Sequence, residues 1–211
     1  MKNNKEQMDS HLLYLYSPPI KKLLCKLKKH HADSYEHSTL TTAMYYDFCR
    51  FSSLNECLTI KSLRSVLMRD VGNLLLPPSM LDNQYALTRY DSTLIKKHPE
   101  YSLNIVSQYP EIDIDPLIIL HHHENINGTG YPSQLTHHSI PDSAKIVRII
   151  DAYTTMSSMN ANKPNLTYVQ ALADLKSYVN IHFDSEYLAF FSLFIENQSQ
   201  MEQRDHSLLN K

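Results

Sequence analysis

The chain has 211 residues, a formal net charge of −2 at pH 7 and a sequence pI of about 6.6. With 42% hydrophobic and 20% charged residues it has the composition of an ordinary globular protein, long enough for one full core or at most two small ones. The near-neutral balance argues against a nucleic-acid partner, because no broad basic surface is available to neutralise phosphates. No apolar run approaches the roughly 18 residues of a membrane span, so we expect no integral membrane segment.

The cysteines and the N-terminus indicate the compartment. Cys25, Cys49 and Cys57 form no C-x-x-C pair, and an odd, scattered set is typical of free thiols in a reducing cytosol. The only apolar run near the N-terminus, LLYLY, is too short for a secretory signal and stops at Pro18-Pro19. We therefore expect a cytoplasmic protein.

The first predicted element is a basic helix within residues 1–30, which we treat as an N-terminal extension. In PIKKLLCKLKKHH one face carries Ile20, Leu23, Leu24 and Leu27, with lysines elsewhere. Such a helix can lie on an anionic membrane surface. Docking on the domain, with a solvated basic face, is the commoner arrangement and the one we expect.

Helical periodicity dominates the rest of the chain, and strand signals are weak because no Val/Ile/Thr alternation lies between Gly turns. Asp91 is a candidate N-cap, and Pro99 directly after His98 should break or kink its helical run. Asp115 before Pro116 predicts the start of a short helix that carries the histidines at its C-terminal end. The expected helical segments are about 36–54, 58–75, 87–109, 113–124, 139–159 (opened by Ser139 and Pro141), 165–180 and 185–196.

The sequence thus predicts an all-α bundle over residues 31–196, followed by a polar tail at 197–211 that should fray. Bundles place metal sites in the core between facing helices. Asp151 lies in an apolar helix and needs a partner, since burying an unpaired charge is costly; pairing with Arg148 or capping a neighbour is the ordinary explanation. His122 and His123 diverge by about 100° on a helix and can serve two metals, or a metal and a phosphate.

Glycine is unusually rare, with three copies where an average of about 7% predicts roughly fifteen. Gly128 and Gly130 lie in HHHENINGTGYP, and Gly72 follows Asp70 in RDVGN. Glycine allows positive φ and close backbone approach, so these two segments are expected to need unusual backbone geometry. Taken alone, Asp70 and Gly72 also fit an ordinary helix C-terminus.

Together these segments resemble the HD-GYP domain, a branch of the HD metal-dependent phosphohydrolases. The order and spacing of EHS, RDVGN, HP, HHENINGTGYP and AKIVRIIDAY are similar to the family's. HHENINGTGYP matches the family motif His-His-Glu-x-x-Asp-Gly-x-Gly-Tyr-Pro without a gap, with Asn127 at the Asp position. The resemblance covers about residues 31–195 and implies a compact helical bundle of the HD-domain type with a metal site in its core.

The resemblance also implies an activity. The family hydrolyses cyclic di-GMP, a bacterial second messenger, using divalent ions, often iron or manganese, that assist an in-line displacement at phosphorus. For this chain it implies one or two ions, with Asp70 between them, and a protein partner contacting the loop of Tyr131 and Pro132. Six residues match metal-ligand positions of the family: His37, Asp70, His98, His122, His123 and Asp151.

The chain departs from the family at three places. The His of the His-Asp pair that names the superfamily is Arg69, which cannot ligate a metal but can bind a phosphate bidentately. The family's phosphate-contacting Lys is Asn73, and an Arg further on is Asn160, with Lys163 nearby. The resemblance thus assigns catalysis to Asp70, Arg69 and Asn73, and substrate binding to Arg69, Asn73, Lys163 and Tyr131.

Three interpretations remain open at this point. The first is an active, metal-dependent cyclic di-GMP phosphodiesterase of reduced activity, favoured by the six retained ligand positions. The second is a catalytically silent module that binds a nucleotide or docks on a partner, favoured by Arg69. The third is an HD-type hydrolase acting on a different phosphate ester.

Overall fold

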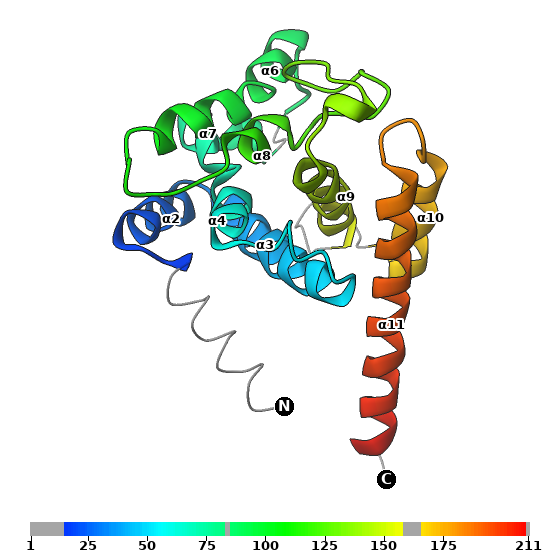
Figure 1. Cartoon of the computed structure of the whole chain (residues 1–211). Coiled ribbons are helices and arrows are strands. Elements are labelled where there is room, and N and C mark those ends of the chain that lie inside the picture. Colours follow the sequence, from blue (N-terminus) through cyan, green and yellow to red (C-terminus); the bar gives the residue numbers. More distant parts are fainter. Residues whose placement is uncertain (1–14, 83–84, 158–165, 210–211) are drawn as a thin grey trace.

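The computed structural model describes residues 15–82, 85–157 and 166–209, with side chains described as far as residue 201. The predicted all-α class is confirmed: this part of the chain is built from helices, with two isolated bridges and no strand (Figure 1). The elements are α2 (Pro18–His30), α3 (Ala32–Phe51), α4 (Ile60–Met68), the 3-10 helix η1 (Val71–Leu75), α5 (Pro78–Leu81), α6 (Arg89–Ile95), α7 (His98–Val106), α8 (Pro116–His121), the 3-10 helix η2 (His137–Ser139), α9 (Asp142–Ser157), α10 (Tyr168–Ser177) and α11 (Ser185–Leu209).

Helix α3 packs against α2, α4 and α9 (Figure 1). Helices α7 and α8 pack on each other, and α8 also packs on α4 and α9. On the other side α10 and α11 cover α9, where Phe191 of α11 meets Phe48 and Tyr153 edge-on, with ring centroids 5.5 and 5.2 Å apart. The six candidate metal ligands lie on or directly after α3, α4, α7, α8 and α9.

Helix α2 is docked on the bundle, as its amphipathic pattern predicts. Ile20, Leu23, Leu24 and Leu27 are all buried, and α2 packs against α3 and η1. Each such side chain contributes about 1.5–3 kcal/mol by leaving water. The face that a membrane surface would need is thus already covered, and only the lysine face remains exposed.

Several helix ends differ from the prediction. Helix α6 is capped by Thr88, whose hydroxyl accepts from the Asp91 amide, while the Asp91 carboxylate accepts from the Thr88 amide at 2.9 Å. Asp91 is therefore the third residue of a capping box and not the N-cap, because the extended backbone lies at Thr88. Helix α9 begins at Asp142, since Ser139 belongs to η2. Asp115 caps α8 as predicted, accepting from the Leu117 amide at 3.0 Å.

Helix α11 is longer than expected. It continues to Leu209, past residue 197 where a frayed tail was predicted, and in Figure 1 it extends well beyond the rest of the bundle. Its sequence has no Gly or Pro, and Gln, Glu and Met favour the helical conformation even without a core to pack on. None of the described helices combines the length and the apolar character needed to cross a bilayer.

Candidate metal centre

The turn after α4 carries Arg69 and Asp70 into the site. The Ser102 hydroxyl of α7 donates to the Arg69 carbonyl at 2.6 Å and accepts from the Gly72 amide at 2.8 Å. A Cβ at Gly72 would overlap the backbone of His98 and Ser102. Glycine is therefore required here for close approach, and that approach brings Asp70 next to the start of α7.

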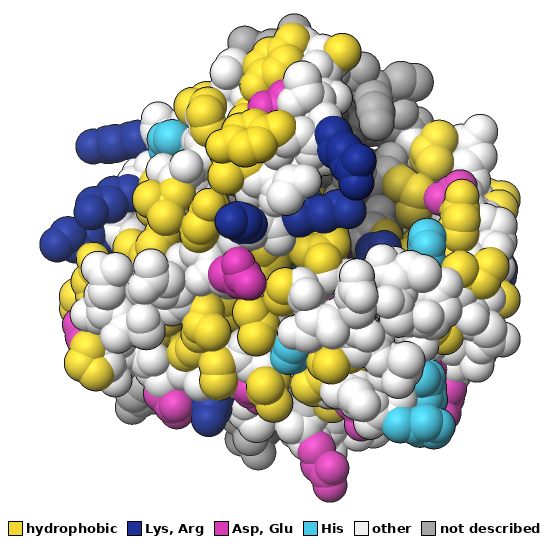
Figure 2. Space-filling model, turned by 90° about the horizontal axis from the view of Figure 1, so that it is seen from above, with side chains coloured by type: hydrophobic (Ala, Val, Ile, Leu, Met, Phe, Trp, Pro, Cys, Tyr) yellow, Lys and Arg dark blue, Asp and Glu magenta, His cyan; other side chains and the backbone are white. Residues whose placement is uncertain are grey.

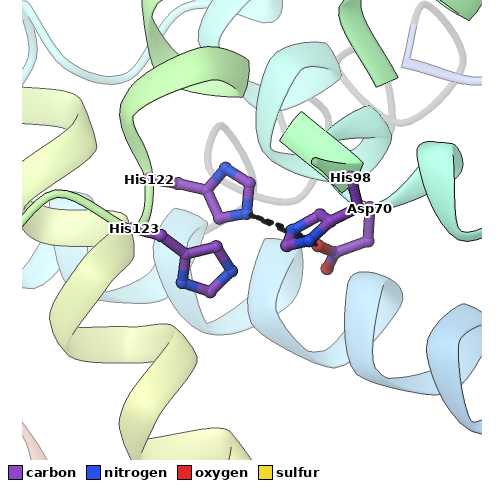
Figure 3. A group of neighbouring side chains, drawn as sticks. All are labelled: Asp70, His98, His122 and His123. Carbon is purple, nitrogen blue, oxygen red and sulfur yellow. Dashed lines mark hydrogen bonds and ion pairs between the residues drawn. The ribbon is translucent and has the colours of Figure 1, made fainter. Parts of the chain in front are cut away.

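Four side chains from three segments converge at this point (Figure 3). Asp70 follows α4, His98 opens α7, and His122 and His123 follow the last residue of α8. The Asp70 Oδ1 atom lies 3.3 Å from His98 Nε2 and 3.5 Å from His122 Nε2, and the two Nε2 atoms are 3.2 Å apart. His123 offers a ligand atom within 4.8 Å of the others.

The hydrogen bonds of His98 and His122 leave the nitrogen that faces the centre for a metal ion. The Nδ1 atoms of His98 and His122 lie 2.9 and 2.7 Å from the carbonyls of Ile95 and Ile119. A carbonyl can only accept, so each Nδ1 carries a proton, which leaves Nε2 as the nitrogen that a metal can take. The two Nε2 atoms and the Asp70 carboxylate oxygen then face one another as candidate ligand atoms.

The spacing of these atoms also fits one ion. Ligand atoms about 2.1 Å from a common ion, at angles of about 90–109°, lie about 3.0–3.4 Å apart. Hydrogen bonding of the second ring nitrogen to a backbone carbonyl is the usual way in which a ligating histidine is oriented. The residues present therefore fit a divalent cation at Asp70, His98, His122 and His123.

A second group shares Asp70 and contains His37 and Asp151. The His37 Nε2 atom lies 2.8 Å from Asp151 Oδ1. Arg69 is part of this group: its Nη2 is 2.7 Å from Asp151 Oδ1 and 2.9 Å from Asp70 Oδ2. Its guanidinium also donates to the Thr41 hydroxyl and to the Val66 carbonyl, and the side chain is completely buried.

The charges around the two groups are strongly coupled. Burial acts to raise the pKa of Asp70, but Arg69 and the hydrogen bonds from His122 and His98 outweigh it and hold that pKa well below its usual range. Asp151 behaves likewise: burial opposes ionisation, and Arg69 followed by His37 keeps its pKa well below normal. Burial lowers the pKa of His122, and burial with the neighbouring His122 lowers the pKa of His123 well below its usual value. Both carboxylates are thus ionised and both imidazoles are neutral near pH 7.

A cavity of about 510 Å³ opens onto both groups. Its lining includes His37, Asp70, His98, His123 and Asp151, together with Asn73 and Tyr131. The Tyr131 ring stacks on His123 with centroids 4.8 Å apart, and Lys96 Nζ lies 5.5 Å from the centre of the Tyr131 ring. Burial raises the pKa of Tyr131, so this wall is a neutral aromatic surface.

The loop after the histidines is held by Glu124, which is buried beside them. Its carboxylate accepts from the amides of Ser133 at 2.7 Å and Leu135 at 3.1 Å. Sequence reasoning gave Glu124 no role, although an acidic residue next to two candidate metal ligands was a usable signal. Gly128 has φ +79°, a conformation that favours glycine, and it supports the same loop.

The predicted site residues have the following places in the structure. The six candidate ligands border one cavity or its floor, and His121 points away toward Glu124, with Nδ1 3.6 Å from Oε1. The ion-pair partners of Asp151 are Arg69 and His37. The Nε atom of Arg148 instead donates to Asn125 Oδ1 at 3.2 Å. Arg69 lies behind the cavity wall, and Lys163 and Asn160 fall outside the described residues.

Comparison with known proteins now identifies the family. A model of the HD domain matches residues 17–187. The chain belongs to the HD domain family. Among curated proteins, this HD domain is 27% identical over 171 residues to a cyclic di-GMP phosphodiesterase of Pseudomonas aeruginosa, covering 80% of the chain and 41% of the relative. It is 32% identical over 138 residues to the cyclic di-GMP phosphodiesterase response regulator RpfG of Xanthomonas campestris pv. campestris, covering 64% and 36%.

These relatives confirm the HD-GYP type expected from the motifs, although the chain spans less than half of their length. Among solved structures, the HD domain of the L. monocytogenes phosphodiesterase PgpH in complex with cyclic-di-AMP aligns with a TM-score of 0.60. The alignment covers 85% of this chain and 96% of that chain at 13% identity, so the likeness is one of fold. The predicted bundle of HD-domain type is confirmed.

Proposed function

We propose that this HD domain is a metal-dependent phosphodiesterase that hydrolyses cyclic di-GMP at a reduced rate. One observation carries the proposal: two histidine Nε2 atoms and the Asp70 carboxylate meet within 3.5 Å at the floor of a cavity. When bound, a divalent ion supplies activation of water and charge neutralisation at phosphate oxygens. Iron or manganese fits the mixed nitrogen and carboxylate ligands.

The chain's own groups would position the nucleotide. Tyr131 and His123, stacked on each other, give the cavity an aromatic wall against which a base can pack, and Lys96 Nζ lies 5.5 Å from the centre of the Tyr131 ring. Asn73 lines the cavity and donates from Nδ2 to the Ser34 hydroxyl at 3.0 Å, so its amide is already oriented toward that wall. We assign Asn73 and Tyr131 to substrate binding, and we assign Lys163 the same role on its position in the sequence alone.

A reduced rate follows from the charge of the cavity. Its described lining contains the carboxylates Asp33, Glu36, Asp70 and Asp151 and no Lys or Arg. A cyclic dinucleotide carries two negative phosphates, so binding must rely on the ion to offset repulsion. Because Asn73 stands where the family has a cation, the transition state also lacks one electrostatic stabiliser.

The second candidate is a catalytically silent module that binds a nucleotide or docks on a protein partner. Arg69 favours it, since its guanidinium already neutralises Asp70 and Asp151. The docking surface would be the loop held by Glu124, where Ser133 and Gln134 are exposed beside Tyr131 and Pro132.

The proposal also includes a cytoplasmic location and no nucleic-acid partner. On the face shown in Figure 2, lysine and arginine side chains form small groups separated by apolar and neutral ones, unlike the continuous basic surface that nucleic acid requires. Cys25, Cys49 and Cys57 are all free, which supports a reducing compartment such as the cytoplasm.

The test is hydrolysis of cyclic di-GMP by the purified chain with added Mn²⁺ or Fe²⁺, followed by separation of the nucleotides. Cyclic di-AMP, 3'3'-cGAMP and a simple phosphate monoester should be assayed in parallel to identify the ester class. The matched control is His122→Ala, which should abolish turnover. Metal-loaded protein that leaves every ester intact would favour the silent module.

A further inference from the structure

The two halves of this site differ in whether an ion can enter them. Both contain Asp70, but it uses a different oxygen in each. Its Oδ1 faces His98 and His122, whereas its Oδ2 faces Arg69. The carboxylate thus divides a metal-binding half from a half that already contains a cation.

We propose that the Arg69 guanidinium permanently occupies the second cation position, so that the chain binds a single metal ion, at Asp70, His98, His122 and His123. Its Nη2 lies 2.7 Å from Asp151 and 2.9 Å from Asp70, between the two carboxylates that an ion in that half would need. Thr41 and Val66 accept two further hydrogen bonds and hold the guanidinium in place. A guanidinium has no acceptor atom, so Arg69 cannot itself become a metal ligand.

His37, the histidine of the half that contains Arg69, also has a partner already. The His37 Nε2 atom already contacts the Asp151 carboxylate at 2.8 Å, on the same Oδ1 atom that Arg69 binds. In the other half the protons of His98 and His122 are on Nδ1, bonded to backbone carbonyls. The Nε2 atoms of His98 and His122 therefore face a carboxylate with no cation between them, whereas the Asp151 oxygen that contacts His37 also binds the Arg69 guanidinium.

The inference rests on the metal centre of the proposed function and on no step of hydrolysis. It is tested by titrating the full metal-free chain with Mn²⁺ alone, using calorimetry for stoichiometry and electron paramagnetic resonance for coupling between ions. We expect one ion per chain and the spectrum of isolated Mn²⁺. Two ions, an exchange-coupled spectrum or no binding at all would overturn the proposal.

A matched pair of variants identifies the half that binds. Loss of an outer partner of a ligand typically weakens metal affinity roughly 10–100-fold, so loss of the ligand in His98→Ala should weaken Mn²⁺ binding by more than about tenfold. His37→Ala should change the affinity for Mn²⁺ by less than about threefold, well below the roughly 10–100-fold that loss of an outer partner of a ligand costs. Equal losses in the two variants would show that the ion lies in the other half or spans both.

Replacing Arg69 should create a second metal-binding position. Arg69→His removes the guanidinium and adds a nitrogen, so the stoichiometry should rise to two ions, and Arg69→His/His37→Ala should return it to one. If Arg69→His remains at one ion while folded by circular dichroism, the guanidinium is not what excludes the second ion. If Arg69→His does not fold, the wild-type spectrum still gives the number of ions, and the His98→Ala and His37→Ala pair still shows which half binds the ion. Failure to hydrolyse cyclic di-GMP would contradict the proposed function and leave these counts unaffected.

Discussion

Arg69→Met should be the most destabilising single substitution in the site. The arginine is completely buried, and its guanidinium is the shared partner of Asp70 and Asp151. Methionine fills a similar volume but leaves two buried carboxylates without a cation. Breaking a buried ion pair by removing one partner costs about 3–5 kcal/mol.

That cost is large for a domain of this size. At about 2–4 °C for each kcal/mol, Arg69→Met should lower the melting temperature by about 6–20 °C. Urea denaturation of the metal-free protein, followed by circular dichroism at neutral pH, measures the free energy of unfolding directly. Arg50→Met is the matched control, because Arg50 is exposed and contacts Tyr46 at the surface, so it should change stability by no more than about 0.5 kcal/mol.

A double-mutant cycle separates charge from packing. In Arg69→Met/Asp151→Asn one of the stranded charges is removed, so about 0.5–3 kcal/mol of the loss should be recovered. Saturating Mn²⁺ should also stabilise Arg69→Met more than the wild type, since the open carboxylates can then recruit an ion. A loss below about 1 kcal/mol in Arg69→Met, or no recovery in the double variant, would refute the role of Arg69 as the buried counter-ion.

Three further predictions concern pH, activity and backbone approach. Because the folded-state pKa values of His122 and His123 lie below the unfolded value of about 6.5, the unfolded chain gains protons first as pH falls. The free energy of unfolding of the metal-free protein should therefore decrease from about pH 7 toward pH 5, and urea midpoints that stay flat over that range would contradict the buried neutral imidazoles. Arg69→His/Asn73→Lys should raise cyclic di-GMP hydrolysis by about 10²–10³-fold and by more than either single change, because it adds a ligand and a phosphate contact; a folded, metal-loaded double variant without turnover would place the defect elsewhere. Gly72→Ala should destabilise the fold by about 1–3 kcal/mol and weaken Mn²⁺ binding, because the new Cβ forces apart the backbone that joins Asp70 to α7; unchanged denaturation and titration curves would show that the turn can relax.

Much of this architecture could be predicted from local signals. The apolar face of α2, the Asp115-Pro116 start of α8 and the break at His98-Pro99 are each encoded within a few residues and appear as expected. The six candidate ligands were chosen by motif order, and the bundle brings them together in two groups that share Asp70. Local periodicity was less informative where helix ends are set by capping detail, as at Thr88, or where no packing surface is involved, as in the last turns of α11.

The decisive contacts could not be predicted because they join distant segments. Asp151 clearly needed a cation, and Arg148 lies only three residues away, so a local pairing was the natural hypothesis. The structure turns Arg148 toward Asn125, and Asp151 receives the guanidinium of Arg69, 82 residues earlier in the chain. Periodicity gives the face of a helix but not which neighbouring helix that face meets.

The same contact changes how Arg69 bears on activity. In a site losing its function, the loss of a metal-binding histidine would leave Asp70 and Asp151 as unpaired buried charges, and such charges are costly. Here the positive charge of the guanidinium stands where that ion would be, and Asp151 keeps a partner. Asp70 still presents its Oδ1 atom to the Nε2 atoms of His98 and His122. Arg69 therefore removes one ion without disassembling the other half of the site. What the chain lacks for fast hydrolysis is then mainly a cation on the cavity side, at Asn73, and this is why we expect slow turnover and not inert binding.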